Sequence, residues 1–317
     1  MAEDSNTVIA ARGLTRRFGV FVAVSDVDLG VQRGEVFGLL GANGAGKTTV
    51  IRMLCGTLAP SRGEIRVAGI DMVRTARSAR GRIGYVAQRF ALYGDLTVLE
   101  NLKLQAGLYN LRGEHARSRL GWALDHLDLK SEQNTRAGEL PLGFQRRLAV
   151  AAALLHEPDV LFLDEPTSGI DPLARQQFWE LVYELAESGI GVLVTTHYMD
   201  EALFCDRLAL MHAGRIVAEG APEDLLARPL ATPILELRTS AGGDWVRWLA
   251  EWPEIREVIP HAGRLRVRLR AAIPSADFIG KIRQEALRRG IPMETVEMAA
   301  PGLEDVFVAV LEEQAAA

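Results

Sequence analysis

An octapeptide near the start of the chain has the residue types and spacing that bind phosphate. Residues 41–48 read Gly-Ala-Asn-Gly-Ala-Gly-Lys-Thr and fit the pattern GxxxxGK followed by Ser or Thr. Glycines let backbone N–H groups curl around phosphate oxygens, and the lysine adds positive charge for the β- and γ-phosphates. The apolar run 36–40 before the loop and the helical spacing after it are the context that this motif requires. We therefore predict a nucleotide phosphate site formed by Gly41, Asn43, Gly44, Ala45, Gly46, Lys47, Thr48 and Thr49.

Two adjacent carboxylates, Asp164 and Glu165, directly follow the apolar run 160–163. Ligands of a parallel sheet bind at the carboxyl ends of its strands, so both acids are placed to act on a bound nucleotide. We expect Asp164 and the Thr48 hydroxyl to hold Mg²⁺, and Glu165 to polarise an attacking water as a general base. Adjacent acids lie more often on a solvated surface, but rarely right after an apolar strand.

The elements that must position these residues alternate between strand and helix patterns. Apolar runs of strand length at 160–163 and 191–195 enclose a capped helical pattern at 171–188. This order predicts an α/β protein with a mostly parallel sheet covered by helices. Together with the phosphate loop, it indicates a protein of the P-loop NTPase kind. The alternating apolar and polar positions of 7–34 predict short strands of an antiparallel β subdomain, and 89–157 is predicted as a helical subdomain.

Length and proline content indicate two domains. The 317 residues exceed the usual size of one domain, and 48% hydrophobic residues suffice for a full core. Prolines at 222, 229 and 233 mark a boundary, so we expect a nucleotide-binding domain at 1–230 and a small accessory domain at 231–317. The accessory domain is predicted to run strand, helix, strand, strand, helix, strand and a final helix, which is a ferredoxin-like α+β arrangement.

Further segments, read in order, resemble the motifs of ABC transporter ATPase subunits. Phe18 matches the aromatic residue that stacks on adenine, with Val24 beneath the ring, and Gln88 is similar to the residue of the family's glutamine loop. Residues 168–171 resemble the loop that crosses to the partner ATPase, and His197 resembles the switch histidine. Each residue alone would more often be a core ring, a surface amide or a satisfied imidazole. Their order favours the resemblance.

The resemblance covers 7–227 and implies ATP and Mg²⁺ as the cofactors of a hydrolytic site. It implies that Gln88 also contacts the metal and that His197 contacts the γ-phosphate. It implies further that two ATPase subunits sandwich the nucleotides, so that Gly143 and Asp171 act in trans on the partner's site. The implied catalytic residues are Lys47, Gln88, Glu165 and His197.

One segment departs from the family pattern. The family signature is Leu-Ser-Gly-Gly-Gln, whereas residues 140–144 read Leu-Pro-Leu-Gly-Phe. Pro141 has neither a hydroxyl nor a backbone donor, and Leu142 adds bulk where close approach is wanted. A proline is tolerated at a helix start, so a helix beyond Gly143 is still expected. The departure is either drift in a tolerant loop or a weakened cross-dimer site, and the second alternative is compatible with a partner that supplies an intact signature.

Two segments, 85–102 and 301–307, are similar to the export-type ABC ATPases that work with small integral permeases. The second segment could also be a plain amphipathic helix with an N-terminal proline. By family analogy the partners are a separate membrane permease of about six helices and a second ATPase subunit, as homodimer or heterodimer. The permease is expected to insert a coupling helix near 90–96, and the transported substrate would be selected by the permease.

Bulk properties limit the other classes of function. The net charge of −5 argues against a dedicated nucleic-acid binder, so no nucleic acid is expected. The longest apolar run, 148–155, is far short of the ~20 residues that span a membrane. A peripheral position at the cytoplasmic face of the inner or plasma membrane is therefore expected. Two alternatives remain: a soluble ABC ATPase acting on ribosomes or nucleic acid, and a kinase on the same loop, which the switch histidine disfavours.

Overall fold

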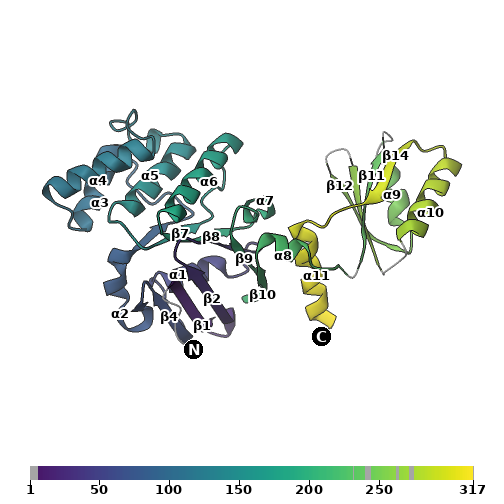
Figure 1. Ribbon diagram of the computed structural model, residues 1–317, viewed down its shortest axis with the longest axis horizontal. Helices are drawn as coiled ribbons and strands as arrows, with labels where there is room; N and C mark the ends of the chain where they lie inside the picture. Colours follow the sequence, from purple (N-terminus) through teal and green to yellow (C-terminus); the bar gives the residue numbers. More distant parts are fainter. Residues whose placement is uncertain (1–5, 231, 240–243, 262–263, 271–274, 317) are drawn as a thin grey trace. The chain divides into compact units, whose positions relative to one another are not determined.

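The structure of the chain, a computed structural model, forms two compact units, Met1–Pro222 and Glu223–Ala317 (Figure 1). The boundary falls between Pro222 and Glu223, which is earlier than the predicted division at 230/231 but coincides with the first proline of the predicted boundary segment. The residues that the structure describes are 6–230, 232–239, 244–261, 264–270 and 275–316.

The first unit is built on a six-stranded sheet in the order β10-β9-β3-β8-β7-β6. Neighbouring strands from β9 to β6 are parallel, and β10 is antiparallel to β9. The predicted mostly parallel sheet is therefore confirmed. Its strands are β3 (Val36–Leu40), β6 (Ile83–Val86), β7 (Val160–Asp164), β8 (Gly191–Thr196), β9 (Arg207–His212) and β10 (Arg215–Gly220).

Helices cover one face of this sheet and include the predicted helical subdomain. A capping box starts the first of them: the Glu100 N–H donates to the Thr97 hydroxyl, and the Thr97 N–H donates to the Glu100 carboxylate. The signature-like segment starts another, because the helix α5 begins at Leu142 directly after Pro141. The helices are α3 (Val98–Leu108), α4 (Gly113–His126), α5 (Leu142–Leu154) and α6 (Pro172–Glu187).

A second, four-stranded sheet in the order β2-β1-β4-β5 is antiparallel. Its first two strands have 12 residues each, longer than the short strands expected, and they form a hairpin in which Phe18 lies opposite Phe21. The turn between them uses Gly19, whose φ is 60°. The elements on this side are β1 (Thr7–Phe18), β2 (Phe21–Gln32), β4 (Arg62–Val67), β5 (Ile70–Asp71) and α1 (Lys47–Leu54).

Both faces of the central sheet are buried, which explains the continuous apolar runs of its strands. Along β7, Leu161 and Leu163 pack in the core beneath α3–α6, whereas Val160 and Phe162 pack in the core that contains α1 and the antiparallel strands. Figure 1 shows β7 and β8 between these two layers. Because β7 is packed on both faces, the residues at its carboxyl end, Asp164 and Glu165, have a fixed position at the edge of the sheet.

The second unit contains an antiparallel sheet in the order β12-β13-β11-β14, with the βαββαβ chain order that the sequence predicts. Trp248 of α9 (Asp244–Ala250) and Phe278 of α10 (Ser275–Arg288) pack with Leu235 and Val267 of the sheet in one core. Asp305 accepts hydrogen bonds from two arginines of β13. The elements are β11 (Ile234–Thr239), α9 (Asp244–Ala250), β12 (Ile255–His261), β13 (Arg264–Leu269), α10 (Ser275–Arg288), β14 (Met293–Met298) and α11 (Leu303–Ala316).

Several short elements are not anticipated by the sequence patterns. The hairpin of β9 and β10 turns through Ala213 and Gly214, which both have positive φ, at 46° and 82°. Ala-Gly is a weak turn signal, so a search for turn dipeptides such as Asn-Gly or Pro-Gly does not identify this hairpin. The short helices are α2 (Met72–Ala79), α7 (Met199–Ala202) and α8 (Pro222–Leu226). Among the described residues, no helix has both the length and the apolar character needed to cross a membrane.

Candidate nucleotide-binding site

The phosphate loop joins β3 to α1, the strand-to-helix context that its motif requires. Gly46 precedes α1 with a φ of 112°, a conformation that costs glycine little. A Cβ at Gly46 would also lie only 2.7 Å from the carbonyl oxygen of Ala23. A side chain is excluded there on both counts. The backbone can therefore turn tightly and present the positive end of α1 to an anion.

Lys47 is buried at the start of α1 and is bonded within its own loop. Its Nζ donates to the carbonyl oxygens of Gly41 at 2.7 Å and Ala42 at 3.3 Å. The same Nζ lies 3.3 Å from Oε1 of Glu165. These oxygens replace the water molecules that the ammonium group loses on burial, because a buried charge must be paired or hydrogen-bonded.

Glu165 is the point at which the predicted catalytic residues meet. Its Oε2 accepts a hydrogen bond from Nε2 of Gln88 at 2.9 Å and lies 3.2 Å from Nδ1 of His197. Its φ is 48°, which is uncommon for a residue with a side chain. The Glu165 N–H donates to the carbonyl of Thr195 on β8 at 3.1 Å, and this bond helps to hold the backbone in that conformation. The carboxylate is thereby aimed at the phosphate loop.

Asp164 and Thr48 form a pair of oxygen donors beside the loop. The Thr48 hydroxyl donates to Oδ1 of Asp164 at 3.2 Å, and the Thr195 hydroxyl donates to the same oxygen at 2.7 Å. Mg²⁺ prefers oxygen ligands and is usually held by one or two protein groups plus phosphate oxygens, so the pair fits this ion. Within the described part of the chain, no group of three or more His, Cys, Asp and Glu side chains could hold a metal alone.

A hollow of about 480 Å³ lies over the phosphate loop and is bordered by Phe18, Phe21, Gln88 and Glu165 among others. Phe18 and Phe21 are both exposed, and the Arg16 guanidinium lies over the Phe18 ring. The sequence prediction omits Phe21. Its place opposite Phe18 across a two-residue turn is the signal that could have identified it.

Val24, predicted to lie beneath the base, is fully buried and does not border the hollow. Ala23 borders it instead. Side chains alternate along β2, so adjacent residues face opposite sides of the strand. The predicted loop residues that border the hollow are Asn43, Gly44, Gly46, Lys47, Thr48 and Thr49.

The two residues predicted to act in trans, Gly143 and Asp171, do not border this hollow. Asp171 caps α6, because its Oδ1 accepts from the N–H groups of Leu173 at 3.1 Å and Ala174 at 3.0 Å. Gly143 lies in the first turn of α5, where a Cβ would lie 3.3 Å from the Cβ of Ala174. The two segments are therefore neighbours of each other rather than of the chain's own phosphate loop.

A second hollow, of about 800 Å³, lies where the residues around Gln88 face the helical layer. We name it the arginine groove after Arg77, Arg80 and Arg89, which line it together with Tyr85 and Tyr109. In the part of the chain that the structure describes, no acidic side chain forms an ion pair with these arginines. Burial, and then the nearby Asp164 carboxylate, raises the pKa of Tyr85 to about 12, so its phenol is neutral at physiological pH.

A phosphate loop at the carboxyl edge of a parallel sheet, with a buried acid pair at the end of a neighbouring strand, defines a P-loop nucleotide-binding protein. A family model described as ABC transporter matches residues 24–168. The chain is 50% identical over 222 residues to the probable multidrug ABC transporter ATP-binding protein YbhF of Escherichia coli (strain K12). That match covers 70% of this chain and only 38% of the length of YbhF.

Other relatives match over more of their length. The daunorubicin resistance ATP-binding protein DrrA3 of Streptomyces coeruleorubidus is 36% identical, over 96% of each chain. Among solved structures, cbiO1 from Clostridium perfringens, part of the ABC transporter complex cbiONQ, superposes with a TM-score of 0.65 at 29% identity, covering 71% of this chain and 92% of that one. The dimeric cassette MJ0796 bound to ADP and Pi gives a TM-score of 0.61 at 27% identity, covering 67% and 98%. This chain belongs to the ABC transporter family of ATP-binding proteins.

Proposed function

We propose that the chain binds ATP with Mg²⁺, hydrolyses it, and thereby powers export through a separate membrane permease. The observation that carries the proposal is the convergence of Lys47, Gln88 and His197 on the single carboxylate of Glu165. Relatives named for multidrug transport, daunorubicin resistance and Nod factor export support the export direction. They favour it over action on ribosomes or nucleic acid.

The proposed hydrolysis depends on positioning and on charge stabilisation. Lys47 exchanges its bonds to the loop carbonyls for the β- and γ-phosphate oxygens, and Glu165 accepts the proton of the attacking water. Gln88 holds Oε2 of Glu165 in place, and His197 contacts the γ-phosphate. Mg²⁺, held by Thr48 and Asp164 with Gln88 nearby, neutralises phosphate charge when bound.

We propose a dimer as the working unit, either of two copies of this chain or of this chain with a related ATPase. Each nucleotide lies between the phosphate loop of one subunit and Gly143 and Asp171 of the other. The position of both residues away from their own phosphate loop supports this arrangement. The dimeric form of the relative MJ0796 also supports it.

The proposed docking site for the permease is the arginine groove. Its lining includes Ala91 and Leu92, from the segment expected to receive a coupling helix, and it lies beside Gln88. Its unpaired arginines favour a helix that carries carboxylates on the contacting face. A permease bound there would hold the chain peripherally at the cytoplasmic face of the membrane, and movement of Gln88 would link the permease to the nucleotide.

The substitution Glu165→Gln tests the hydrolytic part of the proposal. We expect the variant to bind ATP with nearly the affinity of the wild type and to hydrolyse it about 10²- to 10⁴-fold more slowly, because the general base is lost. Phosphate release measures turnover, and fluorescence of a labelled ATP analogue measures binding. Glu157→Gln, at an exposed acid that also has positive φ, is the matched control. Undiminished turnover in Glu165→Gln would remove Glu165 from the proposed role.

Co-purification tests the transport part. The tagged chain is recovered from detergent-solubilised membranes, and its partners are identified by mass spectrometry. We expect an integral membrane protein at near-equal amount. Recovery of ribosomes in its place would support the soluble alternative and contradict the export function.

A further inference from the structure

We infer that Leu142 is a positioning residue for the site made in trans, because its side chain fastens the loop 168–171 to the start of α5. The loop 168–171 and the start of α5, which are both proposed to contact the partner's nucleotide, then form one surface. The inference rests on the proposed dimer, since only a second subunit brings a nucleotide to this surface.

The Leu142 side chain is directed at Gly169 of its own chain. A Cβ added at Gly169 would lie 3.3 Å from Cδ2 of Leu142, tighter than an ordinary van der Waals contact. The φ of Gly169 is 81°, so the backbone there also requires glycine. Leu142 thus covers the one position of the loop at which a bare backbone is available for close packing.

A second contact lies at the next residue of α5, and here the glycine belongs to α5 rather than to the loop. Gly143 in α5 faces Ala174 in the first turn of α6, and the added Cβ of Gly143 would lie 3.3 Å from that methyl group. Since Asp171 caps α6 through Ala174, the loop and the start of α6 are tied together. A leucine against a glycine and a glycine against an alanine therefore interlock α5 with the loop and with α6.

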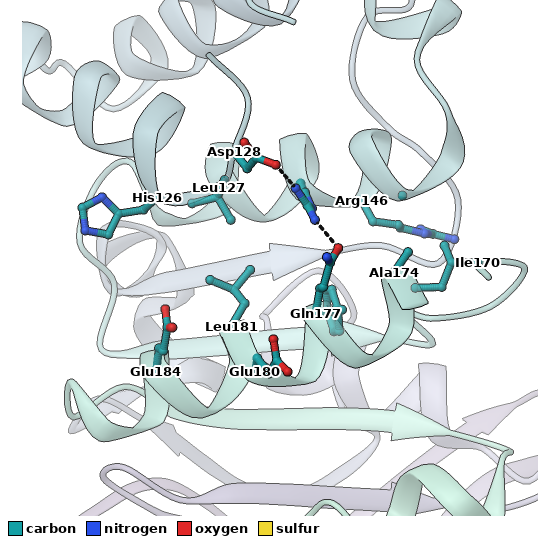
Figure 2. A pocket seen from close by; sticks show the side chains of 13 residues that line it. His126, Leu127, Asp128, Arg146, Ile170, Ala174, Gln177, Glu180, Leu181 and Glu184 are labelled. Atoms are coloured by element: carbon teal, nitrogen blue, oxygen red, sulfur yellow. Dashed lines mark hydrogen bonds and ion pairs between the residues drawn. The ribbon is translucent and has the colours of Figure 1, made fainter. Parts of the chain in front are cut away.

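Polar contacts also join α5 and α6, and Figure 2 shows the dashed lines that run from Asp128 and Gln177 to one side chain between them. Arg147 of α5 donates to Oδ2 of Asp128 at 2.8 Å and to Oε1 of Gln177 on α6 at 2.5 Å. A small pocket of about 180 Å³ lies there and is lined by Gly143, Ile170 and Ala174, among others. The junction is therefore held by the Arg147 hydrogen bonds as well as by the packing at Leu142 and Gly143.

This packing changes the meaning of the departure at 140–144. The bulk of Leu142 is accommodated against Gly169 of its own chain. Pro141 still lacks a hydroxyl and a donor, but α5 begins directly after it, so the positive end of the helix is retained. Restoring the family's glycine at 142 would then remove a contact and loosen the loop that carries Asp171.

The experiment compares Leu142→Ala and Leu142→Met with Leu104→Ala in the full chain. Leu104 is a matched control, because it is a helical leucine exposed to 39%, against 38% for Leu142. We expect Leu142→Ala to lower kcat by about tenfold with little change in KM for ATP, because misplacement of groups that act on the nucleotide slows the reaction while the binding loop is intact. Leu142→Met should restore most of kcat, and Leu104→Ala should match the wild type.

A second readout follows the dimer directly. In the Glu165→Gln background, we expect ATP binding to convert the chain to a dimer, and light scattering measures the fraction of dimer. Adding Leu142→Ala should reduce that fraction. Gly169→Ala should reduce the dimer fraction less in the Leu142→Ala background than in the presence of Leu142, since the alanine methyl group and the leucine side chain compete for one space.

If kcat of Leu142→Ala equals or exceeds that of the wild type, the inference is overturned. This holds even if the variant has a lower melting temperature, because a purely structural role would lower stability without lowering kcat. Absence of ATP turnover in the wild-type chain counts against the proposed function instead, so the two failures are distinguishable.

Discussion

The Nζ atom of Lys47 lies 3.3 Å from Oε1 of Glu165, and both side chains are more than nine-tenths buried. The cation predicted to bind phosphate is thus paired with the carboxylate predicted to activate water. In the proposed reaction a γ-phosphate takes up the Lys47 contact and leaves Oε1 of Glu165 free to accept a proton. Phosphate binding and activation of the base are then linked through one ion pair.

Lys47→Met tests this link. We expect ATP affinity to fall at least about a hundredfold, because the point charge for the phosphates is lost. The free energy of unfolding should also fall by about 1–3 kcal/mol, since the buried Glu165 carboxylate loses its ammonium partner. The double variant Lys47→Met with Glu165→Gln should recover part of that stability, and strictly additive effects in urea unfolding would contradict the coupling.

Phe21→Ala should weaken ATP binding by about tenfold, because an aromatic ring stacked on a base contributes about 1–3 kcal/mol. The ring borders the hollow over the phosphate loop opposite Phe18, which the sequence alone already suggests for adenine. Val20→Ala, in the same turn and fully exposed, is the control. Titration with a fluorescent ATP analogue measures both, and an affinity unchanged in Phe21→Ala would contradict a contact between Phe21 and the base.

Arg77→Glu should reduce co-purification of the permease by several-fold, because the arginine groove is proposed to meet carboxylates. Arg74→Glu is the matched control, since it lies on the same helix, α2, outside the lining of the groove. ATP binding by the isolated chain should be unchanged in both variants. Equal loss of the permease from both variants would show a general charge effect rather than docking in the groove.

His156 makes the stability of the first unit depend on pH. Burial lowers its pKa, its Nε2 contacts the carbonyl of Ile83 at 3.0 Å, and its ring stacks on Tyr109. The unfolded chain therefore binds a proton more readily than the folded one as pH falls below about 6.5, so folding loses stability in that range, by at most about 1.4 kcal/mol per pH unit.

Replacing His156 by Gln should remove this part of the pH dependence. The measurement is the urea midpoint at pH 7.5 and at pH 5.5, followed by tryptophan fluorescence. His115→Gln, at an exposed histidine, should leave the difference between the two midpoints as in the wild type. An identical difference in His156→Gln would contradict the assignment.

Local sequence determined the elements of this protein and the types of its reactive groups. The loop 41–48 requires glycines for backbone reasons that act within a few residues, and the apolar runs of β7 and β8 mark strands buried on both faces. The class of fold, the phosphate loop and the acid pair were predictable on this basis. The hairpin β9–β10 was not, because its Ala-Gly turn carries little local signal.

Tertiary structure decided which of these groups meet. Gln88 and Glu165 are 77 positions apart, and their hydrogen bond exists only because β6 and β7 are neighbours in the sheet. Phe21 borders the nucleotide hollow because strand register places it opposite Phe18. The direction of Leu142 follows from packing against a loop more than one element away. Propensity acts over a few residues, whereas contacts between distant segments depend on how the layers pack, so the sequence by itself named the parts of the site and the fold set their pairings.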